Sequence, residues 1–103
     1  LCVGCIGITP DEFEYSRSGE IGYWLSQQYW GQGIITQAIE LITKEVFEST
    51  NLNRIHAAVF AGNAGSIKAL LKSGFNTEAI LKQAIYKNGH YFDSHIFSML
   101  KTE

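Results

Sequence analysis

The spacing of apolar residues changes along this chain in an order that restricts the fold more than any other feature. Leu1–Thr9 is β-branched and apolar, and EIGYWL at Glu20–Leu25 has the same character, so both segments are predicted strands. The polar loop Pro10–Gly19 lies between them. Because the two strands are neighbours in sequence, we expect them to pair as a hairpin.

A helical pattern follows, then a strand and a second helix. From Ile34 to Phe47 apolar residues recur every three to four positions, which predicts a long amphipathic helix that ends at Ser49-Thr50-Asn51. RIHAAVF at Arg54–Phe60 is a predicted strand. A short helix should open at Asn63-Ala64-Gly65-Ser66 and stop at Gly74.

The end of the chain predicts an antiparallel ribbon. Phe75–Tyr86 and Tyr91–Lys101 are β-rich segments, and Asn88-Gly89 between them favours the positive φ angles of a type I′ turn. This turn would place Tyr86 opposite Tyr91, which helps to fix the register. The chain of 103 residues is therefore expected to be a single domain with an α/β fold.

Composition excludes several classes of function. The net charge is -2 and the eight basic residues are scattered, so we expect no nucleic-acid partner. No apolar segment approaches the roughly 20 residues that cross a bilayer, so we expect no membrane span. Cys2 and Cys5 have no second Cys or His pair to complete a zinc site, which predicts two buried, reduced thiols, no metal, and a cytoplasmic protein.

Two glycines stand directly before the long predicted helix. Gly31 and Gly33 lack a Cβ, so the chain can bend sharply there and a ligand can approach its N–H groups. The first N–H groups of a helix have no partners within the helix and lie at its positive end, which favours a phosphate or pyrophosphate. The alternative is a turn with no ligand. The dinucleotide fingerprint fails because Thr36 replaces its third glycine, and no P-loop Gly-Lys-Ser/Thr is present.

Four segments together resemble one family. EIGYWL, YWGQGIITQAIELI, NAGSIKALLKSGF and the closing YKNG resemble the GCN5-related N-acetyltransferases, and the ribosomal-protein N-terminal branch in particular. The resemblance implies a mixed, mostly antiparallel sheet with two helices. It also implies that residues 1–103 are the C-terminal, cofactor-binding part of the domain, without the family's first strand, helical segment and second strand. We therefore expect either self-association through the uncovered edge or a longer native protein.

The resemblance assigns a binding role to particular residues. The family's Gln/Arg-x-x-Gly-x-Gly/Ala loop keeps its central Gly33, whereas Trp30 and Ile35 depart from it, and Ile35 leaves less room. The pyrophosphate of coenzyme A would lie on N–H groups of Gln32–Thr36. Asn63 and Ser66 would bind the pantetheine arm, although both could be ordinary helix caps. The full predicted set for the cofactor is Tyr23, Trp24, Leu25, Trp30, Gly31, Gln32, Gly33, Ile34, Ile35, Thr36, Asn63 and Ser66.

The resemblance also implies direct acetyl transfer from acetyl-CoA to a primary amine, which could be a protein N-terminal α-amine. An N–H of the strand at Tyr23–Leu25 would stabilise the developing oxyanion. Glu20 is the candidate base, with an exposed surface carboxylate as the alternative. Leu70 stands where many family members have an acidic tyrosine. Water, Ser66 or Tyr86 could substitute, and no general acid is assigned.

Other polar residues and other functions compete with this hypothesis. His56, His90 and His95 are expected to be structural, and Asp93 either orients an amine or satisfies nearby N–H groups. Trp24 and Trp30 either line the pantetheine tunnel or pack against the helix start. A non-catalytic acyl-CoA-binding module is the main alternative function. A purely structural interaction domain is the third.

Overall fold

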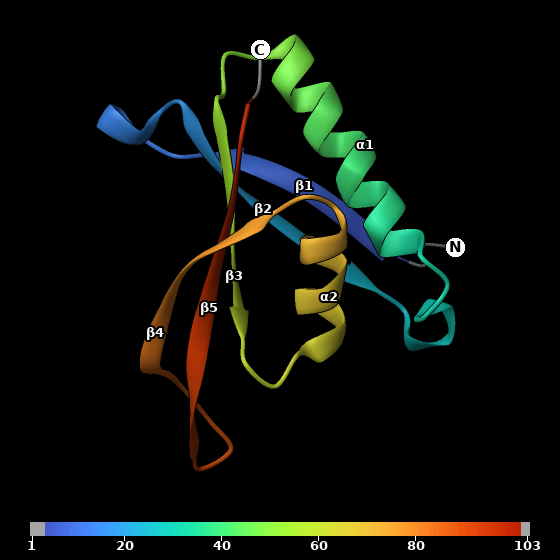
Figure 1. Ribbon diagram of the computed structural model, residues 1–103, viewed down its shortest axis with the longest axis vertical. Helices are drawn as coiled ribbons and strands as arrows, with labels where there is room; N and C mark the ends of the chain where they lie inside the picture. The colour runs from blue at the N-terminus through green and yellow to red at the C-terminus, as the bar shows by residue number, and fades with distance from the viewer. Residues whose placement is uncertain (1–3, 102–103) are drawn as a thin grey trace.

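The computed structural model describes residues 4–101 and has five strands and two helices in the predicted order. The elements are β1 (Gly4–Pro10), β2 (Ser18–Leu25), α1 (Ile34–Ser49), β3 (Arg54–Phe60), α2 (Ala64–Lys72), β4 (Asn76–Lys87) and β5 (His90–Leu100). Short 3-10 turns occupy Phe13–Tyr15 and Gln27–Tyr29. The strands form one sheet in the order β1-β2-β3-β5-β4 (Figure 1). Every neighbouring pair is antiparallel except β2 and β3, which confirms the expected mixed, mostly antiparallel sheet.

The helix α1 forms because one side of it can be buried against the sheet. Ile39 is completely buried, and Ile35, Ile42 and Val46 pack partly buried against the same core. The helix ends where the Thr50 N–H and hydroxyl both donate to the carbonyl of Val46, at 3.0 and 2.7 Å. This end agrees with the sequence prediction.

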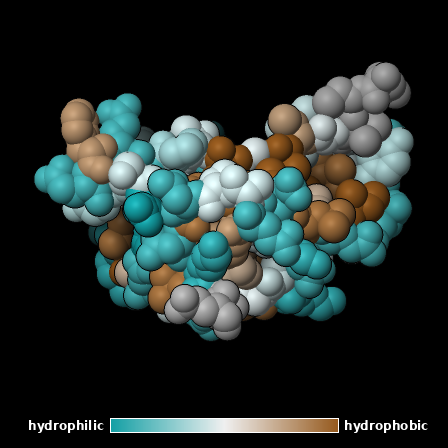
Figure 2. All heavy atoms as spheres, turned by 90° about the horizontal axis from the view of Figure 1, so that it is seen from above, coloured by the Kyte–Doolittle hydropathy of each residue, from teal (hydrophilic) through white to brown (hydrophobic). Residues whose placement is uncertain are grey.

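The core lies on one face of the sheet. Phe97, Ile39, Ile55 and Leu70 are the largest fully buried side chains, and they come from β5, α1, β3 and α2. Both helices cover this face, α1 across the β1–β2 side and α2 beside β3 (Figure 1). In β1 and β2 the alternate residues that point away from the helices are exposed. Seen from above, hydrophobic and hydrophilic residues are mixed, and hydrophobic residues gather toward one side of the molecule (Figure 2).

This exposed face corrects the prediction for Cys5. The sequence suggested a buried thiol, but Cys5 is a free, exposed cysteine. It shares its side of β1 with the exposed Gly7 and Thr9, on the face that no described helix covers. Cys2 lies outside the described residues. The prediction failed because alternation along a strand shows which residues share a face, not which face is covered.

The ribbon of β4 and β5 has the predicted turn. Asn88 and Gly89 have φ angles of 52° and 79°, and Tyr86 pairs with Tyr91 with ring centroids 5.0 Å apart. The register shifts between Leu81 and Ile85, where the N–H of Gln83 donates to a carboxylate oxygen of Asp93 at 2.9 Å. This bond lowers the pKa of Asp93, and the nearby Lys82 ammonium lowers it further. Asp93 thus satisfies a local N–H group, the second of its two predicted roles.

Candidate functional site

Strand β2 is paired from Gly19 to Leu25 on one edge and over only three residues on the other. It pairs with β1 from Gly4↔Leu25 to Pro10↔Gly19, over the whole length of β1. Its parallel pairing with β3 covers only Ser18↔Arg54, Gly19↔Ile55 and Glu20↔His56. Beyond that point β2 and β3 separate, leaving an opening that we define by residues 21–25 of β2 and 57–60 of β3.

The opening leaves backbone polar groups without partners in the sheet. In an antiparallel ladder, the N–H and C=O groups of a strand point alternately to one neighbour and to the other. Those of β2 that point toward β3 beyond Glu20 have no strand to bond there. Backbone groups of this kind must bond to water or to a ligand. The opening can therefore bind an extended chain with amide groups of its own, as a third strand would.

The loop after β2, residues 26–33, connects the β2 side of the opening to the start of α1. The Trp30 indole N–H donates to the carbonyl of Leu25 at 2.7 Å, and the Gln32 side-chain amide donates to the carbonyl of Gln28 at 3.3 Å. Gly31 and Gly33 have φ angles of 77° and 74°, in the left-handed region that residues with a Cβ rarely adopt. The backbone conformation itself therefore favours glycine at both positions.

The start of α1 is a ready site for an anion. The first bond of the helix runs from Gln37 N–H to the carbonyl of Gly33, and Gly33 provides no side-chain cap. The N–H groups of Ile34, Ile35 and Thr36 precede that bond and have no acceptor within the helix. Because this end of a helix dipole is positive, a phosphate is the favoured occupant. The Ile35 side chain packs against the core, so it does not fill the loop.

The start of α2 lies across the opening from β2. The Asn63 side-chain oxygen accepts from the Ser66 N–H at 3.1 Å, a typical helix cap. The Ser66 hydroxyl contacts the Tyr23 hydroxyl, which comes from β2. Burial raises the pKa of Tyr23, and the hydrogen bond to Ser66 opposes this only partly. Residues 43 positions apart therefore meet at the opening, a contact that the sequence pattern did not predict.

The three candidate positions for an acid lie in different surroundings. Leu70 is completely buried in the core, so its side chain contributes to packing and cannot act as a general acid. Tyr86 is 67% exposed beside the turn of the β4–β5 ribbon. Ser66 lies at the opening with Tyr23. Of these three side chains, only Ser66 lies at the opening, where it contacts Tyr23 of β2.

Glu20 and His56 form the last pair before β2 and β3 separate. Glu20 is exposed on the face away from the helices. His56 is partly buried, and its Nε2 lies 2.8 Å from a carboxylate oxygen of Asp11. This link ties the loop after β1 to β3, which agrees with a structural His56. The sequence pattern did not predict the contact between His56 and Asp11, because the two residues are 45 positions apart.

Trp24 and Trp30 occupy different surroundings. Trp24 is 51% exposed and pairs with Cys5, on the face away from the helices. Trp30 is 62% exposed and is held in the loop by its bond to Leu25. Trp24 therefore does not pack against the start of α1. Trp30 lies beside the glycines of the loop that leads to the start of α1.

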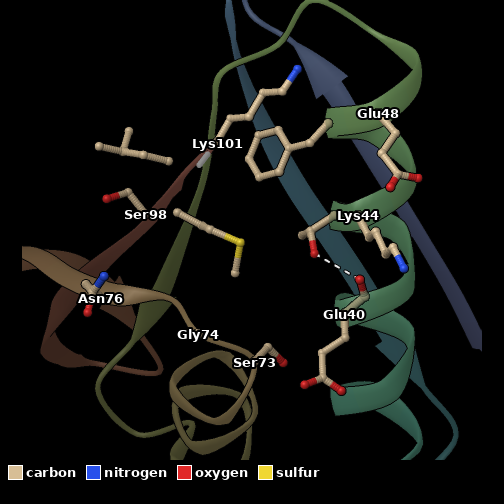
Figure 3. Close-up of a pocket in the computed structure, with 12 residues that line it drawn as sticks. Glu40, Lys44, Glu48, Ser73, Gly74, Asn76, Ser98 and Lys101 are labelled. Atoms are coloured by element: carbon tan, nitrogen blue, oxygen red, sulfur yellow. Dashed lines mark hydrogen bonds between the residues drawn. The ribbon is translucent and has the colours of Figure 1, made fainter. Parts of the chain in front are cut away.

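A cavity of about 840 Å³ lies elsewhere, between α1, the residues that follow α2, the start of β4 and the end of β5 (Figure 3). Its charged residues are Glu40, Lys44, Glu48 and Lys101, which balance one another. Gly74 and Met99 contribute an apolar part of the wall. Because this cavity has neither one-signed charge nor an unpaired strand edge, we place the candidate site at the opening instead.

Residues 4–101 contain neither a membrane-spanning helix nor a metal cluster. No helix of the described chain is both long and apolar enough to span a membrane. No group of three or more His, Cys, Asp or Glu side chains able to hold a metal occurs within those residues.

Comparisons with known proteins agree with this geometry. A model of the acetyltransferase (GNAT) domain matches residues 1–76. The uncharacterized N-acetyltransferase YoaA of Bacillus subtilis (strain 168) is 36% identical over 99 residues, which are 96% of this chain and 55% of YoaA. The ribosomal-protein-serine acetyltransferase of Escherichia coli (strain K12) is 34% identical over 85 residues, 82% of this chain and 48% of that protein.

A solved structure with bound coenzyme also has this fold. It is RimL, a ribosomal L7/L12 α-N-protein acetyltransferase in complex with coenzyme A. The TM-score is 0.86 with 26% identity, over 95% of this chain and 55% of that one. The chain thus spans about half the length of the curated relatives it matches. With its splayed strands, glycine loop and capped second helix, the chain belongs to the GCN5-related N-acetyltransferase (GNAT) family.

Proposed function

We propose that this chain is the coenzyme-binding part of an N-acetyltransferase that uses acetyl-CoA and a primary amine. One observation carries the proposal: β2 and β3 separate after three pairs, next to a helix start with two left-handed glycines. The unpaired strand edge suits the amide groups of a pantetheine arm. The helix start suits a pyrophosphate. Both parts of one ligand therefore find matching groups in adjoining elements.

The residues present fit coenzyme A at each end of this site. N–H groups of Gln32–Thr36 would hold the pyrophosphate, and the main chain of Tyr23–Leu25 would hold the pantetheine arm and the acetyl carbonyl. Asn63 would contribute its side-chain NH₂, because its oxygen is already used by the Ser66 N–H. Bound acetyl-CoA would supply an acyl group activated as a thioester. The chain itself supplies orientation and hydrogen-bond donors.

Glu20 is our proposed base. It is the last residue of β2 paired with β3, and its exposed carboxylate can reach water or an amine that approaches on the face away from the helices. An α-amine is largely protonated at neutral pH and must lose that proton before its nitrogen can attack, so a carboxylate there, acting directly or through water, would accept the proton. His56 is bonded to Asp11 and is not needed for this role.

The acceptor that we propose is a protein N-terminal α-amine. Two similar proteins are named for acetylation of ribosomal proteins, one of them at the α-amine. The exposed face of the sheet beside the opening is free of helices within the described chain, so a peptide could approach there. A non-catalytic acyl-CoA-binding module is the second candidate, favoured by the buried Leu70 in place of an acidic side chain.

Calorimetry with coenzyme A tests the proposal. Gly33→Val forces a β-branched residue into a φ of 74°, so binding should fall at least about tenfold. Gly33→Asn tolerates left-handed φ better and should lose less. Gly65→Ala in the first turn of α2 is a folding control, since a Cβ added there would meet nothing within 4 Å. If folded Gly33→Val binds as tightly as the unchanged chain, the backbone cradle is wrong.

Turnover separates the two candidate functions. A protein extended upstream to the length of the relatives should acetylate a peptide α-amine, with thiol release in step with acetylation. Coenzyme binding without turnover on α-amine, lysine, polyamine or aminoglycoside acceptors would instead support the binding-only module.

A further inference from the structure

A pair of hydroxyl groups joins the two arms of the opening, which are β2 on one side and β3 with the following α2 on the other. Tyr23 belongs to β2, and Ser66 belongs to α2, which follows β3 directly. Past Glu20↔His56 the two strands have no ladder pairing. Beyond that pair, no ladder of backbone hydrogen bonds between β2 and β3 fixes the distance between the two arms. The Tyr23–Ser66 hydrogen bond is placed to fix that distance instead.

The chemistry of the two groups indicates which one donates. A phenol is a much stronger acid than an aliphatic alcohol, so it is the better donor and the alcohol oxygen the better acceptor. Burial raises the pKa of Tyr23, so the phenol keeps its proton throughout the neutral range. When Tyr23 donates, the proton of the Ser66 hydroxyl is left to bond elsewhere.

The rest of Ser66 is fixed. Its N–H donates to the Asn63 side chain at 3.1 Å, which anchors it in the first turn of α2. Within residues 4–101 its hydroxyl bonds to Tyr23 alone. A serine beyond the first turn of a helix often donates back to a carbonyl one turn earlier, as Ser49 at the end of α1 does to Glu45 at 2.6 Å. Ser66 is in the first turn and makes no such bond.

We infer that Tyr23 is a positioning residue for the pantetheine arm: its hydroxyl donates to Ser66, braces the opening, and directs the Ser66 hydroxyl proton to the bound ligand. This inference rests on the proposed function. It adds a role for the Tyr23 side chain, whereas the proposed function uses only the main chain of Tyr23–Leu25. It also gives Ser66 a donor role separate from helix capping.

Calorimetry with two probes tests the inference. Coenzyme A carries both the pyrophosphate and the pantetheine arm, whereas ADP carries adenosine and the diphosphate but no pantetheine arm. Tyr23→Phe keeps the ring and removes the hydroxyl, so it should weaken coenzyme A about three- to tenfold and leave ADP unchanged. Ser66→Ala should do the same. The double variant should be no weaker than the weaker single variant, because the two hydroxyls act as a unit.

Controls separate positioning from folding. Ser66→Thr retains a hydroxyl and should largely restore coenzyme binding. Tyr91→Phe, in the ribbon, removes a matched phenol outside the site and should change neither affinity. Thermal unfolding of each variant shows whether the fold survives.

The outcomes are distinct. If coenzyme A binds Tyr23→Phe as tightly as, or more tightly than, the unchanged chain, the positioning role is overturned and the proposed function stands. An equal loss for coenzyme A and ADP also overturns it, since the effect would then be general. If the unchanged chain binds neither probe, the proposed function fails and the inference fails with it.

Discussion

The two edges of β2 differ although one strand forms both. Toward β1, every residue of β1 has a partner on β2. Toward β3, pairing stops at Glu20↔His56, although β2 continues to Leu25 and β3 to Phe60. Strand β3 shows the same contrast, because it pairs with β5 along its whole length from Arg54↔Leu100 to Phe60↔Ser94.

This contrast shows how a ligand site can be built from ordinary residues. The pairing of β2 with β1, the pairing of β3 with β5 and the two helices hold β2 and β3 in place. The conformational entropy of these two strands is therefore already lost on folding, before any ligand binds. What remains between them is backbone with unused hydrogen-bonding capacity. We therefore expect changes in the closed region to affect stability, and changes at the opening to affect ligand binding.

The largest predicted effect concerns the closed region. Phe97 is completely buried on β5, opposite Ala57 of β3. Phe97→Ala removes this ring and leaves a cavity, so it should lower the free energy of unfolding by about 3–5 kcal/mol, measured by chemical denaturation. Leu41→Ala, at a residue 71% exposed on α1, is the control and should change it by less than about 0.5 kcal/mol. A loss below about 1 kcal/mol for Phe97→Ala would contradict the assignment of the core.

Hydrogen exchange should resolve the two edges of β2 residue by residue. Amides of residues 21–25 that point toward β1 should exchange slowly, and those that point toward β3 should exchange roughly a hundredfold faster. Coenzyme A should slow the fast set and leave the slow set unchanged. The measurement is exchange followed by NMR. Uniform protection along β2 would mean that the opening is closed in solution.

Asn63 can separate capping from binding. Asn63→Asp keeps an oxygen for the Ser66 N–H but removes the side-chain NH₂ donor, so stability should hold while coenzyme A binds more weakly. Asn63→Ala removes both and should also cost about 1 kcal/mol of stability. Denaturation and calorimetry on the same samples measure the two effects. If Asn63→Asp binds coenzyme A normally, Asn63 is a helix cap and no more.

The smallest effect is expected at the closed end of the β2–β3 pairing. Arg54 donates to both carboxylate oxygens of Glu78, at 2.9 and 2.7 Å, and these bonds lower the pKa of Glu78. The pair therefore adds stability above the ordinary carboxyl pKa, and this is lost as pH falls through the lowered pKa of the folded state.

Because the Arg54–Glu78 pair is exposed, Glu78→Gln should cost roughly 0.5 kcal/mol or less at neutral pH. The difference from the unchanged chain should shrink in acid and in high salt, measured by denaturation across pH. Glu12→Gln, an exposed carboxylate in the loop after β1, is the control. A cost that stays the same from neutral to strongly acid pH would exclude the ion pair as its source.

The sequence by itself determined the elements and the chemistry of the loop. Apolar spacing predicted both α-helices and all five strands of the described chain to within a few residues, because a helix and a strand bury one side at different periods. Gly31, Gly33, Asn88 and Gly89 could be placed for a similar reason, since positive φ suits few residues. The family resemblance, now confirmed, depended on such local patterns.

Only the tertiary structure decided where β2 leaves β3, which face of the sheet is covered, and which side chains meet across the opening. Cys5 is exposed for that reason, and Leu70 is a core residue. The Tyr23–Ser66 and His56–Asp11 contacts join residues 43 and 45 positions apart. Sequence periodicity predicts which residues of one segment share a face. Contacts between segments depend instead on how those segments pack against one another in the folded chain.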